Sequence, residues 1–121
     1  MAAWTQFEEL ECWQAARKLN REIWKRILEG QFGRDFALID QINRSAGSAM
    51  DNISEGFDGG SNAEFAKFLT YSQRSCSEVR SQLYRALDRS HIDQEAFDEL
   101  AALALEVHRK TGGLIKYLRS K

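Results

Sequence analysis

The sequence predicts an all-α protein, an antiparallel up-down-up-down four-helix bundle that forms a single domain over residues 1–121. Three observations support this fold class. The chain contains no proline, and a proline in a helix interior costs about 3 kcal/mol. No segment of five or more residues shows the alternation and β-branched enrichment of a half-buried strand. Apolar residues instead recur every three or four positions in four long segments joined by short connections.

The first helix is expected at about 6–29. Thr5 and Glu8 have the spacing of a capping box, in which each side chain accepts a hydrogen bond from the other residue's backbone N–H. Gly30 and Gly33 follow the last apolar position and are expected to end the helix. The apolar stripe consists of Phe7, Leu10, Trp13, Ala16, Leu19, Ile23 and Ile27.

The second helix is expected at about 34–55. Gly56 is well placed to follow its last turn in the left-handed conformation, since glycine enters that region without steric penalty. Gly47 lies inside the helix, where glycine costs about 1 kcal/mol relative to alanine, and this indicates a packing reason for its presence. The apolar stripe consists of Phe36, Ile39, Ile42, Ala46, Ala49, Met50 and Ile53.

The third and fourth helices are expected at about 62–90 and 94–119. Ser61 and Glu64 form a second capping box, and Asp93 can cap the last helix. Together the apolar stripes predict a core that includes Phe65, Phe68, Val79, Leu83, Ile39, Ile42, Ile53, Leu103, Val107 and Leu114.

Composition and charge exclude several classes of protein. With 17 basic and 18 acidic residues the formal charge is −1, so the whole chain has no electrostatic attraction to nucleic acid or to an anionic membrane. No apolar run approaches the roughly 20 residues of a membrane-spanning helix. Glu8, Glu9 and Glu11 stand where a signal peptide needs basic and apolar residues. We therefore expect a cytoplasmic protein without a membrane partner, and two widely separated cysteines suit a reducing compartment.

No motif predicts a cofactor, a metal or a catalytic centre. A di-iron bundle requires Glu-x-x-His segments, which the chain lacks, and no glycine-rich segment has the residues of a phosphate-binding loop. Cys76 lies on the apolar stripe of the third helix, where burial should raise its thiol pKa and make it unreactive. We therefore expect no enzymatic activity, and no small-molecule substrate is indicated.

One spacing resembles a catalytic signature. Arg85 and His91 form an Arg-x5-His pair, as in the helical HEPN-type ribonucleases. The same side chains lie near the expected end of the third helix, where they can instead hydrogen-bond its last carbonyl groups. The ribonuclease interpretation predicts that a His91→Ala variant loses any RNA cleavage.

The second helix also carries a stripe of hydrogen-bonding side chains, calculated at 100° per residue to lie opposite its apolar stripe. This polar stripe is either a solvated face or a contact with a second subunit, in which paired donors and acceptors fix the register. Trp24 lies off the centre of the first helix's apolar stripe and is a further interface candidate, because tryptophan is enriched at interfaces. The polar stripe consists of Gln41, Arg44, Ser48, Asn52 and Glu55.

Basic side chains form one row on the first helix and another on the third. Rows of this kind are usually solvated helix faces, but repetition around an oligomer would multiply the local positive charge on which phosphate binding depends. The alternative function is therefore a nucleic-acid-binding accessory protein that contacts RNA or DNA through these rows. They consist of Arg17, Arg21 and Lys25 on the first helix and Lys67, Arg74, Arg85 and Arg89 on the third.

Three short segments resemble the 23S rRNA intervening-sequence proteins, which are small bacterial four-helix-bundle proteins with no agreed biochemical activity. The segments are Cys-Trp-Gln-Ala-Ala at 12–16, Asn-Ile-Ser-Glu-Gly at 52–56 and Glu-Phe-Ala-Lys-Phe-Leu at 64–69, followed by Ser75 and Glu78. The resemblance extends to the accessory protein of diversity-generating retroelements, a pentameric ring that binds nucleic acid and a reverse transcriptase. It implies a ring-like homo-oligomer, with a pentamer as the example. We therefore expect a non-enzymatic, self-associating scaffold or binding module.

Overall fold

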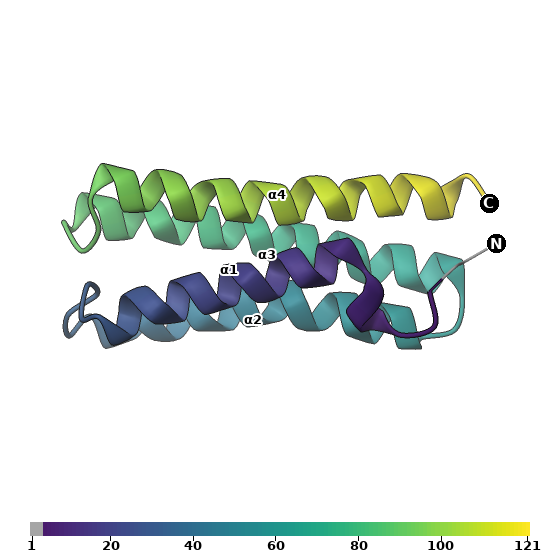
Figure 1. Ribbon diagram of the computed structural model, residues 1–121, viewed down its shortest axis with the longest axis horizontal. Helices are drawn as coiled ribbons and strands as arrows, with labels where there is room; N and C mark the ends of the chain where they lie inside the picture. The colour runs from purple at the N-terminus through teal and green to yellow at the C-terminus, as the bar shows by residue number, and fades with distance from the viewer. Residues whose placement is uncertain (1–3) are drawn as a thin grey trace.

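The computed structural model describes residues 4–121 as four antiparallel α-helices (Figure 1). They are α1 (Glu11–Leu28), α2 (Phe36–Asp58), α3 (Asn62–Asp88) and α4 (Gln94–Arg119), preceded by a short 3-10 helix, η1 (Phe7–Glu9). No strand occurs in this part of the chain. The all-α bundle predicted from the sequence is therefore confirmed.

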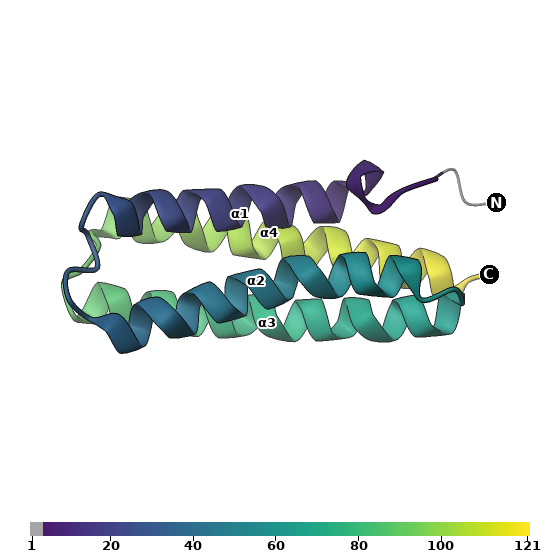
Figure 2. The same ribbon diagram turned by 90° about the horizontal axis from the view of Figure 1, so that it is seen from below.

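Each helix packs against two neighbours, so the bundle has four sides. Close contacts join α1 to α2, α2 to α3, α3 to α4, and α4 back to α1. Figures 1 and 2 show the α1–α2 and α3–α4 connections at one end of the bundle, and the α2–α3 connection and the C-terminus at the other. Because consecutive helices run in opposite directions, residues far apart in the sequence lie at the same level along the bundle.

The start of the first helix differs from the prediction. Leu10 has an extended backbone (φ −74°, ψ 127°) that separates η1 from α1, and its side chain is buried in the core. Thr5 and Glu8 therefore do not form the expected capping box. Instead, the backbone N–H and the hydroxyl of Thr5 donate to the Glu9 carboxylate at 2.9 and 3.1 Å. Full burial of a leucine stabilises by about 1.5–3 kcal/mol, which compensates for the helical hydrogen bonds lost at the break.

α2 begins later than predicted, and its first turn faces differently. Asp35 is the N-cap, and its carboxylate accepts a hydrogen bond from the Leu38 N–H at 3.4 Å. Leu38 is buried and Phe36 is exposed, so the prediction that Phe36 belongs to the apolar stripe is wrong. Phe32, in the α1–α2 connection, is fully buried. Helical periodicity could not identify Phe32 because this residue lies outside a helix.

The glycines of α2 have different roles from those predicted. Gly56 does not follow the helix but lies within it, since α2 continues to Asp58. A Cβ at position 56 would lie 2.7 Å from the Cβ of Phe68, so the close approach of α3 requires glycine there. The left-handed residue is Gly60, with φ +99°. Among residues 4–121, no atom outside α2's own backbone lies within 4 Å of the corresponding Cβ position at Gly47, so this part of the chain supplies no packing reason for the glycine.

The N-termini of the last two helices agree with the prediction. The Ser61 hydroxyl accepts from the Glu64 N–H at 3.1 Å, and the Asp93 carboxylate accepts from the Ala96 N–H at 2.8 Å. α3 ends two residues earlier than expected, and α4 has the predicted bounds.

The predicted core is confirmed for most of its members. Phe65, Val79, Leu83, Ile42, Ile53 and Val107 are buried, and Phe68, Ile39, Leu103 and Leu114 are half-buried. None of the helices in residues 4–121 has an apolar stretch long enough to cross a membrane.

Candidate functional site

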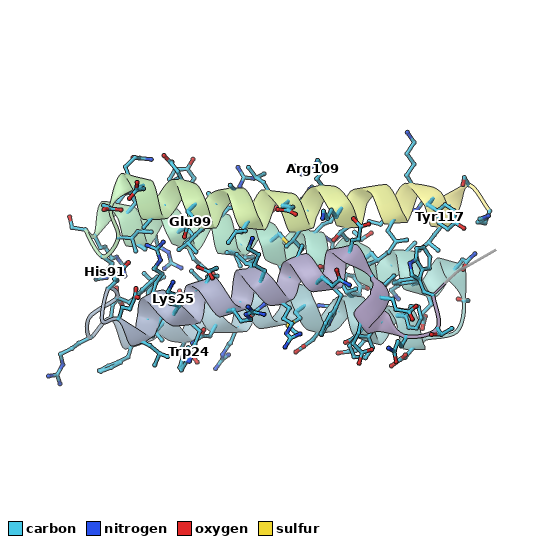
Figure 3. The ribbon with its side chains drawn as sticks, viewed as in Figure 1. Trp24, Lys25, His91, Glu99, Arg109 and Tyr117 are labelled. Atoms are coloured by element: carbon cyan, nitrogen blue, oxygen red, sulfur yellow. The ribbon has the colours of Figure 1, made fainter. Side chains whose placement is uncertain are left out.

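A shallow apolar groove runs along the outer side of α1 and α2. Trp24 and Leu28, one turn apart on α1, have 48% and 70% of their surface exposed. Met50 of α2 lines the same groove, which has a volume of about 700 Å³. Figure 3 shows Trp24 beside Lys25 on the α1 side of the bundle. Clustered exposed apolar side chains are typical of an interaction surface.

The basic row predicted on the first helix forms a rim along this groove. Arg17, Arg21 and Lys25 all line it. The guanidinium of Arg17 also lies 5.9 Å from the ring centre of Trp13, a favourable cation–π distance. The row is therefore a basic rim along an apolar groove that Glu29 also lines.

Part of the polar stripe of α2 contacts α3. Gln41, Arg44 and Glu55 are exposed, as expected for a face opposite the core, whereas Ser48 and Asn52 are half-buried. The Ser75 hydroxyl donates to the Ser48 hydroxyl at 3.0 Å, and Arg85 Nη2 donates to Gln41 Oε1 at 2.6 Å. Asn52 Nδ2 donates to the Ser48 hydroxyl at 2.9 Å. The angle around α2 gives the position of these residues relative to the apolar stripe of α2 but not relative to other helices. α3 packs beside that stripe and contacts some of the polar residues next to it.

Buried polar groups extend the contact between α2 and α3. The Ser72 hydroxyl donates to the Ala49 carbonyl at 2.7 Å, and Gln82 Nε2 donates to the Ser45 hydroxyl at 2.9 Å. Ser72, Gln82 and Ser45 are all buried. Because a buried polar group is costly without a partner, these bonds specify the register of α2 against α3.

Two further members of the polar stripe lie on the surface. Arg44 forms an exposed ion pair with Asp40, one turn earlier in α2, at 3.2 Å. Such surface pairs contribute about 0.3–0.5 kcal/mol. Glu55 is also exposed. Of the five interface candidates on α2, Gln41 and Ser48 are bonded to α3. Within residues 4–121, Arg44 and Glu55 have no such bond, and the side chain of Asn52 bonds only to Ser48 of its own helix.

The basic row predicted on the third helix does not form one surface. Arg85 donates to Gln41, and Arg89 Nη1 lies 2.8 Å from Asp35 Oδ2. Both arginines are therefore held by residues of the α2 region. Lys67 and Arg74 lie towards the other end of α3 and are exposed.

Lys67 and Arg74 share a groove with the end of the chain. This α3–α4 groove has a volume of about 740 Å³, and Arg119 and Lys121 also line it. Tyr71 lies in the same groove, with the Arg74 guanidinium 5.8 Å from its ring centre. Sequence reasoning missed Arg119 and Lys121 because each helix face was considered separately and basic residues late in α4 were explained by the helix dipole. Antiparallel packing places them beside the start of α3.

The Arg-x5-His pair is divided between two partners. Arg85 binds Gln41, whereas His91 Nε2 lies 2.9 Å from Asp35 Oδ2. The imidazole also stacks against Phe32, with ring centres 6.0 Å apart. Each member of the pair therefore has a structural contact of its own.

Both cysteines are free and buried. Burial raises the pKa of the Cys12 thiol to about 11 and that of Cys76 to about 12, as predicted in direction for Cys76. Nucleophilic attack requires the thiolate, which does not form near neutral pH in either residue. Among residues 4–121, no group of three or more His, Cys, Asp and Glu side chains is placed to hold a metal ion.

Comparison with known proteins agrees with this architecture. The family model for the 23S rRNA-intervening sequence protein matches residues 8–113. The chain belongs to this family. Among solved structures it is similar to a protein of unknown function from the S23 ribosomal protein family of Bacteroides thetaiotaomicron, with 20% sequence identity and a TM-score of 0.79 over 87% of this chain and 98% of that one. That likeness shows the fold alone, and no curated protein sequence matches the chain.

Membership of the 23S rRNA-intervening sequence protein family confirms the resemblance seen at 12–16, 52–56 and 64–69. In this family member the last two segments meet in space, because Gly56 allows α3 to approach at Phe68. These segments therefore have a packing role. The similar solved structure has no known function, so the comparisons assign a family and a fold and leave the activity to the chain's own surfaces.

Proposed function

We propose that this intervening-sequence protein is a non-enzymatic binding module of the cytoplasm that self-associates through the α1–α2 groove into a closed ring. The observation that supports this is the exposed pair Trp24 and Leu28, in a groove that also contains Met50. Tryptophan is among the residues that dominate binding energy at interfaces, and the adjacent leucine extends the apolar area. The two free cysteines fit a reducing compartment.

Gly47 supports the same surface. It lies on α2 between Asn43 and Met50, which both line the groove, at the i−4 and i+3 spacings that share a helix face. In the described part of the chain, no neighbouring element has an atom within 4 Å of the place where its Cβ would stand, so packing among residues 4–121 does not require glycine. A helix of a neighbouring subunit that packs closely in the groove would leave no room for a Cβ at position 47 and would therefore require glycine there.

The outer face of α4 offers a complementary surface. Leu105 is 43% exposed, and Glu95, Asp98 and Ala102 are exposed at spacings that place them on the same helix face. The first half of this face is acidic and apolar and suits the apolar groove and its basic rim, whereas the exposed Arg109 lies further along it. Contact between two different faces of identical chains generates a ring when the rotation closes, whereas a two-fold dimer requires one self-complementary face. This pairing favours a ring.

The test is the mass of the protein in solution, measured by light scattering on a sizing column at low and at high salt. We expect a stable multiple of 13.9 kDa. The double variant Trp24→Ser, Leu28→Ser should be monomeric with the helical content of the parent, since both side chains are exposed. Tyr84→Ser is the control, because Tyr84 is an exposed aromatic residue of α3 outside the groove. A monomeric parent, or an unchanged mass in the double variant, contradicts the proposal.

A second candidate function, nucleic-acid binding as an accessory protein, is supported by the four basic residues of the α3–α4 groove. Retention on an immobilised RNA column should fall steeply with salt, because counterions are released when phosphates are neutralised. Arg74→Glu should reduce retention more than Arg85→Glu, since Arg85 is already bound to Gln41. Retention that ignores salt and both substitutions contradicts this function.

A further inference from the structure

We infer that the α3–α4 groove is a discrete site for a ligand that carries two or more linked phosphate groups. The natural ligand would be a single-stranded nucleic-acid segment. In this respect the inference rests on the second candidate function, which it deepens. It is independent of self-association, because Trp24 and Leu28 lie in a different groove.

The charge of the groove supports an anionic ligand. Four basic residues line it, namely Lys67, Arg74, Arg119 and Lys121, and no acidic residue does. The whole chain has a formal charge of −1, so the groove is far more positive than the chain as a whole. Phosphate binding depends on such local charge and not on the total.

Three basic side chains of the groove are not paired with a carboxylate. Arg26, Arg89 and Lys110 each pair with a carboxylate, at Glu99, Asp35 and Glu106 respectively. Within residues 4–121, no ion pair involves Lys67, Arg74 or Arg119. A phosphate entering the groove therefore does not have to displace a carboxylate from these three residues.

The spacing of the charges selects a ligand with more than one phosphate. Lys67 and Arg74 are seven residues apart on α3 and lie on the same side of the helix, about 10 Å apart along its axis. A linked series of phosphate groups matches this axial spacing and can contact both side chains in extended conformations. The volume of about 740 Å³ accommodates such a series.

The start of α3 adds a second source of positive potential. Asn62 and Ala63, the first two residues of the helix, line the groove. Backbone N–H groups in the first turn have no partner within the helix, and the helix dipole makes this end positive. The small side chains of Ala63 and Ala66 keep this part of the groove open to a phosphate.

The experiment is a titration of the full chain with a fluorescein-labelled single-stranded oligo(U) of about ten nucleotides, followed by anisotropy, with unlabelled tripolyphosphate as competitor. Lys67→Glu and Arg119→Glu change the groove. Lys116→Glu is the matched control, because Lys116 is exposed on α4 one turn before Arg119 and does not line the groove. Circular dichroism checks that all variants are folded.

We expect each groove variant to lower oligonucleotide affinity about tenfold, and the double variant to lower it at least about thirtyfold. The control should change the affinity less than about twofold. The measurement is made at physiological salt, where charges are screened beyond about 8 Å. Four phosphate contacts predict a slope of about −2.8 for log K against log salt, and the double variant should reduce its magnitude by about 1.4. Tripolyphosphate should displace the oligonucleotide and lose affinity in the same variants.

Other outcomes separate the site from the function. Equal losses from Lys116→Glu and Arg119→Glu overturn the inference, because binding would then follow bulk charge. Oligonucleotide binding that is lost in Arg21→Glu but retained in the groove variants also overturns it, while nucleic-acid binding itself survives. Direct titration with tripolyphosphate, followed by calorimetry, covers the remaining case: if it binds the groove and the oligonucleotide does not, the site stands and the nucleic-acid function fails. If neither ligand binds, both fail.

Discussion

The Nε2 atom of His91 lies 2.9 Å from Oδ2 of Asp35, and this contact joins the α3–α4 connection to the α1–α2 connection at one end of the bundle (Figure 3). Arg89 Nη1 lies 2.8 Å from the same oxygen, and Phe32 stacks against the imidazole. Asp35 is also the N-cap of α2, accepting from the Leu38 N–H. One carboxylate therefore caps a helix and holds two connections together.

Replacement of Asp35 by Asn should lower stability at neutral pH and have less effect in acid. The hydrogen bond from His91, followed by that from Arg89, lowers the pKa of Asp35 from 3.8 to about 2. Because the pKa is lower in the folded state, the stabilisation is fully present above pH 3.8 and is lost as the pH falls through about 2. Thermal midpoints of parent and Asp35→Asn, measured by circular dichroism, should differ at neutral pH and converge near pH 2.

The control for this titration is Asp51→Asn, which changes an exposed carboxylate in the middle of α2. Its midpoint should follow that of the parent at every pH. A midpoint difference for Asp35→Asn that stays constant from neutral pH into acid would show that the loss is independent of the carboxylate charge.

Gly56→Ala should destabilise the protein, and Gly47→Ala should stabilise it. A Cβ at position 56 would lie 2.7 Å from that of Phe68, and overpacking of this kind costs about 1–3 kcal/mol. Position 47 is open within residues 4–121, so in the monomeric Trp24→Ser, Leu28→Ser background alanine there should add about 0.5–1 kcal/mol of helix propensity. Urea unfolding measures both, and the two single-methyl changes control for each other. Similar effects of the same sign would refute the close approach of α2 and α3.

Gly47→Leu should lower the native mass while leaving the helices intact. The leucine side chain would enter the α1–α2 groove, where no atom of the chain opposes it, and would occupy the space proposed for a neighbouring subunit. The measurement is light scattering together with circular dichroism. An undiminished native mass would exclude a close helix contact at this position.

The two thiols should resist alkylation in the folded protein. Burial raises their pKa values to about 11 for Cys12 and about 12 for Cys76, so almost no thiolate is present at pH 8. Treatment with iodoacetamide, followed by mass spectrometry, should show no modification of the native chain and two modifications in urea. Rapid labelling of either cysteine without denaturant would contradict its burial.

Local patterns in the sequence predicted most of the fold. The spacing of apolar residues identified four helices, and Ser61 and Asp93 marked two helix starts because a cap depends on residues within one turn. Predictions failed where a distant contact decides the local structure. Leu10 breaks the first helix to reach the core. Gly56 lies inside α2, where the absence of a Cβ leaves room for Phe68 of α3.

The candidate surfaces were less predictable than the fold. Trp24 and the basic residues beside it were identified individually, since exposure on a helix follows from its angle. Their combination with Met50 in one groove depends on how α1 and α2 pack. The contacts of Gln41 and Ser48 with α3 were missed because no single-helix calculation includes the position of α3.

The sequence by itself determined an all-α chain, the extent of its helices to within a few residues, and the side chains that prefer a core, because periodicity and capping act within one helix. Only the tertiary structure decided which polar groups are satisfied within the chain and which remain for a partner. It ties Arg85 and Arg89 to α2 and places Arg119 beside Lys67. The physical reason is that charge and exposure at these sites depend on neighbours from other helices, which antiparallel packing brings together from opposite parts of the chain.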